Sequence, residues 1–100
     1  MEKQSGARHV AEARHEVTRR RFEVEEEGAT AILTYELRDG SIVFTHTIVP
    51  ENIEGRGIGG RLAEAGLDYA REQGLKVVPQ CSFVRAYIER HPEYADLLAT

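Results

Sequence analysis

The alternation of apolar and polar residues predicts three consecutive β-strands in the first half of the chain. Three stretches alternate in this way, residues 18–25, 29–38 and 41–49. Asp39-Gly40, between the second and the third, is a strong signal for a two-residue hairpin turn. Pro50 ends the third strand because it has no amide hydrogen to continue the ladder. The pattern therefore predicts an antiparallel meander.

Strict alternation divides the third predicted strand into two faces. One face is expected to hold Ile42, Phe44, His46 and Ile48, and the other Val43, Thr45, Thr47 and Val49.

The apolar spacing changes to a helical period after residue 57. An apolar stripe in residues 57–73 predicts a long helix that Gly74 ends, with Ile58, Leu62, Ala65, Gly66 and Tyr69 facing inward. A short strand over residues 75–78 ends at Pro79. Ser82 is expected to cap a second helix that reaches residue 88 or 90, with Phe83, Ala86 and Tyr87 facing inward. A last helical turn is expected over residues 94–98. The predicted order is β-β-β-α-β-α, and the helical crossover makes the fourth strand parallel to the third.

Length and composition limit the range of functions. One hundred residues form a single domain, and we expect residues 1–16 to be a flexible N-terminal segment and residues 17–100 to be the domain. The single cysteine forms no internal disulfide, and the sequence has no Cys/His spacing typical of a metal site. No apolar run spans a bilayer or resembles a signal peptide. We expect a cytoplasmic protein with no membrane partner, as a monomer or weak homodimer.

Charge is unevenly distributed along the chain. Residues 1–21 hold six basic and three acidic side chains, whereas residues 22–100 carry a net charge of -7. Such a body repels polyanions, and a short basic segment without interleaved aromatics is a weak signal for nucleic acid. We therefore expect no nucleic-acid partner, and interpret Arg19, Arg20 and Arg21 as charges that discourage edge pairing of a strand.

A glycine-rich loop precedes the long predicted helix. Unpaired amides and the helix dipole attract phosphate at such a position, and glycines allow close approach of the backbone. The alternative is a turn that needs glycine for geometry alone. A Rossmann loop requires an acidic residue about twenty positions on, and a P-loop requires Gly-Lys-Ser/Thr; both are missing here. The candidate phosphate-binding residues are Gly55, Arg56, Gly57, Ile58, Gly59, Gly60 and Arg61.

In this arrangement the chain resembles the GNAT acetyltransferase superfamily, whose coenzyme A loop reads Gln/Arg-x-x-Gly-x-Gly/Ala. Gly57 and Gly59 match its glycines, whereas Glu54 stands where the family has Gln or Arg. Three further segments look like the minimal acetyltransferase-like proteins of about 100 residues: residues 44–50, 77–83 and 87–94. The resemblance implies a single-domain α/β (α+β) GNAT-like acyl-CoA N-acyltransferase fold with a mixed, mainly antiparallel sheet. It also implies acetyl-CoA as cosubstrate and acetyl transfer to an amine.

The resemblance suggests roles for residues near the third strand and the last helix. A backbone amide at Ile48 or Val49 would bind the thioester oxygen. His46 or Glu51 would act as the base, and the alternative for His46 is a packed core histidine. Cys81 follows a strand end and precedes a helix, where it would take the acetyl group or protonate the leaving thiolate; the alternative is a buried small hydrophobe. Tyr87 occupies the position of the family's general acid, with a core aromatic as the alternative.

The sequence lacks the two helices that wall the acceptor cleft in larger members of the superfamily. We therefore expect an open acceptor site, or one completed by a second chain or a partner, and a protein lysine or N-terminus as the acceptor. The other possible function is a non-catalytic acetyl-CoA-binding or protein-interaction module, which the carboxylate of Glu54 favours.

Overall fold

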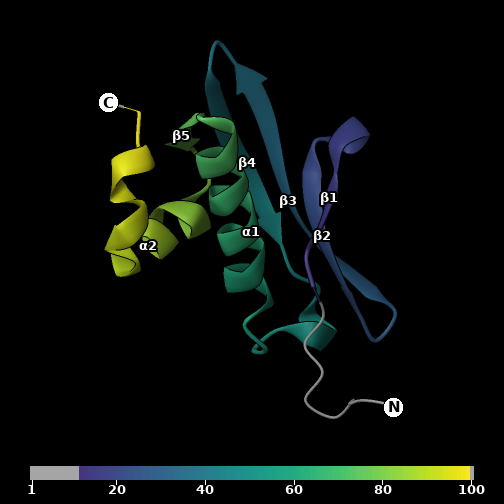
Figure 1. Ribbon diagram of the computed structural model, residues 1–100. Coiled ribbons are helices and arrows are strands. Elements are labelled where there is room, and N and C mark those ends of the chain that lie inside the picture. Colours follow the sequence, from purple (N-terminus) through teal and green to yellow (C-terminus); the bar gives the residue numbers. More distant parts are fainter. Residues whose placement is uncertain (1–11, 100) are drawn as a thin grey trace, which may run out of the picture.

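A five-stranded sheet in the order β1-β2-β3-β4-β5 forms the frame of the protein (Figure 1). The computed structural model describes residues 12–99. The strands are β1 (Arg14–Glu16), β2 (Arg21–Glu26), β3 (Ala29–Arg38), β4 (Ser41–Ile48) and β5 (Lys76–Pro79), and the helices are α1 (Ile58–Gln73) and α2 (Ser82–Arg90). Within this range the fold also has three 3-10 turns, η2 (Val17–Arg19), η3 (Glu51–Ile53) and η4 (Pro92–Leu97). The expected meander is β2-β3-β4, and β5 pairs in parallel with β4 as predicted.

The first strand, β1, was not predicted, because three residues are too few to show a period. It pairs antiparallel with β2 and closes the edge that Arg19, Arg20 and Arg21 were expected to protect. His15 fixes it in place: its ring stacks on Phe22 at 4.2 Å, and its Nε2 lies 2.5 Å from the Tyr35 hydroxyl. The expectation that residues 12–16 stay outside the domain is therefore wrong, and residues 1–11 lie outside the described part of the chain.

A β-bulge in β4 changes which side chains face the helices. Tyr35 pairs with Phe44 but Thr34 pairs with His46, so Thr45 is an extra residue in β4. Beyond the bulge the alternation is reversed. His46 and Ile48 are exposed on the open face, whereas Thr47 pairs with the buried Leu33 and faces the helices. The expectation that His46 and Ile48 share a face with Phe44 is wrong for this reason.

Both helices contribute to one apolar core on the Phe44 face of the sheet. Helix α1 approaches the sheet closely at Gly66, where an added Cβ would lie 2.8 Å from the Phe44 ring and 3.2 Å from Leu33. Helix α2 buries Val84 and Ile88 rather than the expected Phe83, Ala86 and Tyr87, which are exposed or half-buried. The reason is that α2 lies beside the first turn of α1, and Phe83 and Tyr87 cover that turn instead of entering the core.

Candidate functional site

The glycine loop leads from η3 into the first turn of α1. Ile53 is fully buried and fixes the start of the loop. Gly55 and Gly57 have φ angles of 80° and 74°, the left-handed conformation that side chains disfavour. Nothing lies within 4 Å of a Cβ added at either glycine. Open space therefore lies beside both residues.

The N-terminus of α1 faces a cavity of about 380 Å³. Gly57 is the N-cap, and the first α-helical bond is donated by the Arg61 amide to the Gly57 carbonyl, at 3.1 Å. The amides of the residues between them have no partner within the helix. The cavity is lined by Val49, Ile53, Glu54, Gly55, Gly57, Ile58, Gly59, Gly60 and Phe83. Unpaired amides and a positive helix dipole at an open cavity suit a phosphate group.

The glycines of this segment serve two different purposes. Unlike Gly55 and Gly57, Gly59 is in close contact with α2: an added Cβ would lie 2.7 Å from Cζ of Phe83. A Cβ at Gly60 would be 3.5 Å from the Tyr87 ring. Gly59 and Gly60 thus let α2 pack against the first turn of α1, which makes Phe83 one wall of the cavity.

The two arginines of the loop differ in their surroundings. The guanidinium of Arg56 donates to Glu26, the last residue of β2, and to Glu27 of the β2-β3 turn, with both shortest distances at 2.8 Å. These bonds raise the pKa of Arg56, with the bond to Glu27 the largest cause. Its side chain is thus turned to the β2-β3 turn, which argues against the expected phosphate contact. Arg61 is half-buried in the first turn of α1.

Strands β4 and β5 separate at the other end of the site. Their parallel register ends with Phe44 opposite Pro79, although β4 continues to Ile48. The Cys81 amide donates to the Phe44 carbonyl at 2.9 Å, which brings the start of α2 against β4. Beyond this bond, residues 45–48 have β3 on one side and no described strand on the other. A strand edge is thus open next to Cys81.

The Cys81 thiol is buried beside this edge. Its Sγ lies 3.1 Å from the Thr47 hydroxyl, and the residue is 8% exposed. Cys81, rather than the expected Ser82, is the N-cap of α2, and it makes no side-chain cap hydrogen bond. The sulfur therefore faces β4 instead of the helix amides.

His46 lies on the opposite face of β4 from Thr47. It is exposed, next to a hydrogen bond of 2.6 Å between the hydroxyls of Thr34 and Thr45. The alternative that His46 is a core histidine is wrong, because the bulge turns it out of the core. Of the two residues expected to offer an amide to the coenzyme, Val49 lines the cavity and the side chain of Ile48 is 55% exposed.

Tyr87 lies over the N-terminal turn of α1. Burial raises the pKa of its hydroxyl, and the carboxylates of Glu64, Glu93 and Asp68 raise it further. The ring stacks on His91 with 3.9 Å between centroids. The phenol is thus held in place and protonated at neutral pH.

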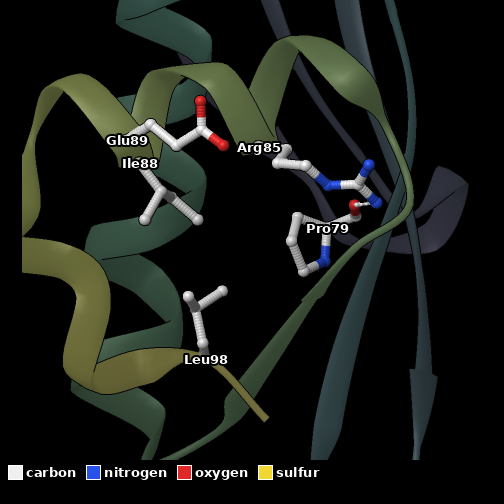
Figure 2. Close-up of a pocket in the computed structure, with 5 residues that line it drawn as sticks. All are labelled: Pro79, Arg85, Ile88, Glu89 and Leu98. Carbon is white, nitrogen blue, oxygen red and sulfur yellow. Dashed lines mark hydrogen bonds between the residues drawn. The ribbon is translucent and has the colours of Figure 1, made fainter. Parts of the chain in front are cut away.

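A second, smaller cavity of about 220 Å³ lies between α2 and the C-terminal segment. Figure 2 shows Ile88 and Leu98 pointing toward one another across it, with Arg85 bonded to the Pro79 carbonyl. None of the predicted site residues lines this cavity. We therefore assign the candidate site to the cavity at α1.

Within residues 12–99, no group of three or more His, Cys, Asp or Glu side chains is arranged to hold a metal ion. None of the helices in that range is long and apolar enough to cross a membrane.

Two parts of the site were missed by sequence reasoning. Strict alternation assigned Thr47 to the face away from Phe44. Only a sequence pattern that predicted the β-bulge in β4 would have placed Thr47 beside Cys81. Phe83 was expected in the core, although the small residues Gly59 and Gly60 in α1 were a sign that a bulky neighbour packs there.

The comparisons with known proteins agree with this geometry. The model of the family described as GCN5-related N-acetyl-transferase matches residues 21–97. Protein NATD1 of Mus musculus is 38% identical over 81 residues, which cover 78% of this chain and 74% of that protein. Protein NATD1 of Danio rerio is 32% identical over 87 residues, which cover 82% and 79%.

A solved structure also shares the fold. The NMR solution structure of a GCN5-like protein from Staphylococcus aureus superposes with a TM-score of 0.69 and 30% sequence identity. The match covers 89% of this chain and 88% of that one.

Proposed function

Because the chain belongs to the GCN5-related N-acetyltransferase family, we propose that it binds acetyl-CoA and transfers the acetyl group to an amine of a protein acceptor. The observation that carries the proposal is the open cavity at the N-terminus of α1, continuous in sequence with the free end of β4.

The loop and α1 fit the pyrophosphate of coenzyme A. Gly55 and Gly57 leave room for the anion, and the amides of Ile58, Gly59 and Gly60 are available as donors. Among the described residues that line the cavity, Glu54 is the one carboxylate, and it opposes the anion. The helix amides therefore supply most of the attraction, with Arg61 nearby in the same turn and Arg56 engaged by Glu26 and Glu27.

The free edge of β4 suits the thioester end of the substrate. Bound acetyl-CoA supplies an activated acetyl group as a thioester. An amide of Ile48 or Val49 stabilises negative charge on the carbonyl oxygen as the acceptor nitrogen attacks. The bulge leaves His46 exposed on one face of this edge and Thr47 on the other, so the acceptor approaches from the open face and the coenzyme from the helix side.

The chain supplies a base and an acid for the transfer. His46 accepts the proton that the acceptor nitrogen loses as its bond to the acetyl carbon forms. The bond from that carbon to sulfur breaks, and the leaving thiolate needs a proton. Tyr87 is held protonated and donates it. The imidazole of His46 is exposed and the phenol of Tyr87 is held in place by stacking on His91, so each is positioned to transfer a proton.

Cys81 is the candidate nucleophile, and its amide and thiol both contact β4. Its contact with Thr47 supports two roles. In the first, its sulfur bonds to the acetyl carbon, the bond from that carbon to the coenzyme sulfur breaks, and the thiol proton passes to that sulfur. The acetyl-cysteine thioester then breaks as the acetyl group moves to the amine, and the cysteine sulfur takes up a proton. In the second, its S–H takes the place of the Tyr87 hydroxyl as the donor of the proton to the leaving thiolate, and no acetyl-protein forms.

Acetyl-CoA with a radiolabelled acetyl group tests the proposal. The purified protein is incubated with it in the presence and absence of a pool of peptides with free amines. We expect label on the peptides, reduced at least about a hundredfold in His46→Ala, the scale of lost acid–base catalysis. Label on the protein that is absent from Cys81→Ala assigns the covalent role to the thiol. Peptide labelling that occurs without label on the protein and is slowed in Cys81→Ala assigns the proton-donor role to the thiol. Coenzyme binding without transfer to any amine would contradict the enzymatic proposal.

A further inference from the structure

Three guanidinium groups meet at one buried carboxylate on the open face of the sheet. Glu23 of β2 is 5% exposed and faces away from the helices. Arg21 Nε lies 2.7 Å from its Oε2, Arg14 Nη2 lies 3.0 Å from its Oε1, and Arg19 Nη1 lies 3.8 Å from its Oε2. The hydrogen bond from Arg21 is the largest cause of the lowered pKa of Glu23. We call Arg14, Arg19 and Arg21 the arginine cluster.

The single carboxylate of Glu23 neither neutralises the three positive charges of the cluster nor accepts from all of its N–H donors. Each guanidinium has five N–H donors, and each directs one nitrogen at Glu23. Within the described residues, the three side chains form no other ion pair. Arg14 and Arg19 remain 56% and 65% exposed. Closely spaced guanidinium groups with free donors are a suitable site for a second carboxylate, bound in a bidentate manner.

The strand register relates the cluster to His46. Arg21 pairs with Thr34, and Thr34 pairs with His46, so the three form one row across the open face. Neighbouring strands lie about 4.8 Å apart, which puts the two ends of the row roughly 10 Å apart at the backbone. In the next row, Ile32 and the exposed Ile48 form an apolar surface beside His46.

The other charges on this face favour a peptide over a nucleic acid. Glu16 pairs with Arg21 from β1, and Glu25 follows Glu23 on the same face of β2. These carboxylates interrupt the positive surface and would repel a continuous run of phosphates. A peptide with one carboxylate and a nearby apolar side chain could contact the arginine cluster and Ile48 without approaching the carboxylates of Glu16 and Glu25.

We propose that the open face binds the N-terminal segment of an acidic protein, with the terminal amine at His46 and a carboxylate about three residues later in the arginine cluster. Three residues of extended chain span roughly 10 Å, which matches the row from His46 to Arg21. This inference rests on the proposed function, since it names the acceptor of that reaction.

Eight-residue peptides with one free amine, at the N-terminus, test the inference. One peptide has Asp at position 4, a second has Asn there, and a third has the Asp at position 8. We expect KM for the first to be at least roughly fivefold lower than for the other two, with similar kcat, because the carboxylate adds a charge-assisted contact. In a turnover-independent assay, the first peptide should also shift the amide signals of Arg21 and Thr34.

A matched pair of charge reversals isolates the cluster. Arg19→Glu should abolish the preference for Asp at position 4 and leave coenzyme affinity unchanged. Arg90→Glu makes the same change in net charge on an exposed residue of α2 and should keep the preference. Arg19→Gln removes the charge without adding repulsion toward Glu23, and it should also reduce the preference for Asp at position 4. It replaces Arg19→Glu in the test if that variant proves unstable.

The outcomes separate this inference from the proposed function. Equal KM values for the Asp and Asn peptides, with transfer intact, overturn the acidic acceptor alone. Competition by a single-stranded oligonucleotide that also shifts Arg21 would overturn it in favour of a nucleic acid. Loss of all coenzyme binding in the wild type would instead contradict the proposed function.

Discussion

The thiol sulfur of Cys81 and the hydroxyl oxygen of Thr47 lie 3.1 Å apart, although 34 residues separate them in the sequence. The contact joins the N-cap of α2 to the part of β4 beyond the bulge. It exists because the bulge at Thr45 turns Thr47 toward the helices and because the Cys81 amide bonds to the Phe44 carbonyl. One irregular residue in a strand thus determines which side chains surround the candidate nucleophile.

Thr47→Val should slow acetyl transfer about tenfold, because the substitution removes the polar partner of the thiol at nearly constant volume. The rate of peptide labelling at saturating acetyl-CoA measures the effect, and titration calorimetry should show an unchanged coenzyme affinity.

Thr45→Val is the matched control, since Thr45 lies on the same strand but its hydroxyl bonds to Thr34 on the opposite face. Equal rates in the two variants would show that the contact between Thr47 and Cys81 has no part in the reaction.

Gly57→Asp should weaken coenzyme binding by at least about 2 kcal/mol, because it adds a negative charge at the N-cap of α1, where the pyrophosphate is proposed to lie. Gly57→Asn is nearly identical in shape and tolerates the positive φ of 74° about as well, but it adds no charge. Calorimetry should find the loss mainly in the Asp variant. A similar loss in both variants would mean that backbone geometry, rather than charge at the helix terminus, governs binding.

Gly66→Ala should lower the free energy of unfolding by about 1–2 kcal/mol, as measured by urea denaturation. Alanine is the better helix former, but its Cβ would lie 2.8 Å from the Phe44 ring, and overpacking of a core outweighs the gain in helix propensity. Phe44→Leu makes room for that methyl group, so the double variant should be more stable than the sum of the single effects predicts. An increase in stability for Gly66→Ala alone would contradict the close packing of α1 on β4.

Glu23→Gln should destabilise the protein at neutral pH and have less effect in acid. The pKa of Glu23 is lowered from its ordinary value of 4.5 by Arg21 and Arg14, so its contribution to stability is present above pH 4.5. That contribution is lost as the pH falls through the lower value of the folded state. Urea denaturation of both proteins at a series of pH values checks this. Glu25→Gln, an exposed neighbour on the same face, is the control and should have little effect at any pH. A wild-type advantage that stays constant in acid would contradict the account of the arginine cluster.

The sequence predicted the order of the main elements because their periods are long and their ends are marked. Helix α1 ends at Gly74 and strand β5 ends at Pro79, as expected. The helical crossover correctly predicted the parallel pairing of β5 with β4. The strand β1 is too short to show a period. It depends on tertiary contacts of His15 with Phe22 and Tyr35 that a local pattern does not contain.

The site was predicted in its loop better than in its side chains. Gly55 and Gly57 indicated an open helix terminus, and the structure has one. The positions of His46 and Thr47 depend on a single inserted residue in β4, and alternation alone assigns both to the wrong face. Arg56 was expected beside the phosphate because the sequence does not reveal that Glu26 and Glu27 lie within reach of it.

The most direct test of the account is a titration of isotopically labelled protein with acetyl-CoA, followed through its backbone amide signals. The account predicts the largest shifts at Gly57, Ile58 and Gly59, smaller ones at Val49 and Cys81, and none at Gly40 in the distant β3-β4 turn. Saturating acetyl-CoA that leaves the first turn of α1 unshifted would contradict it.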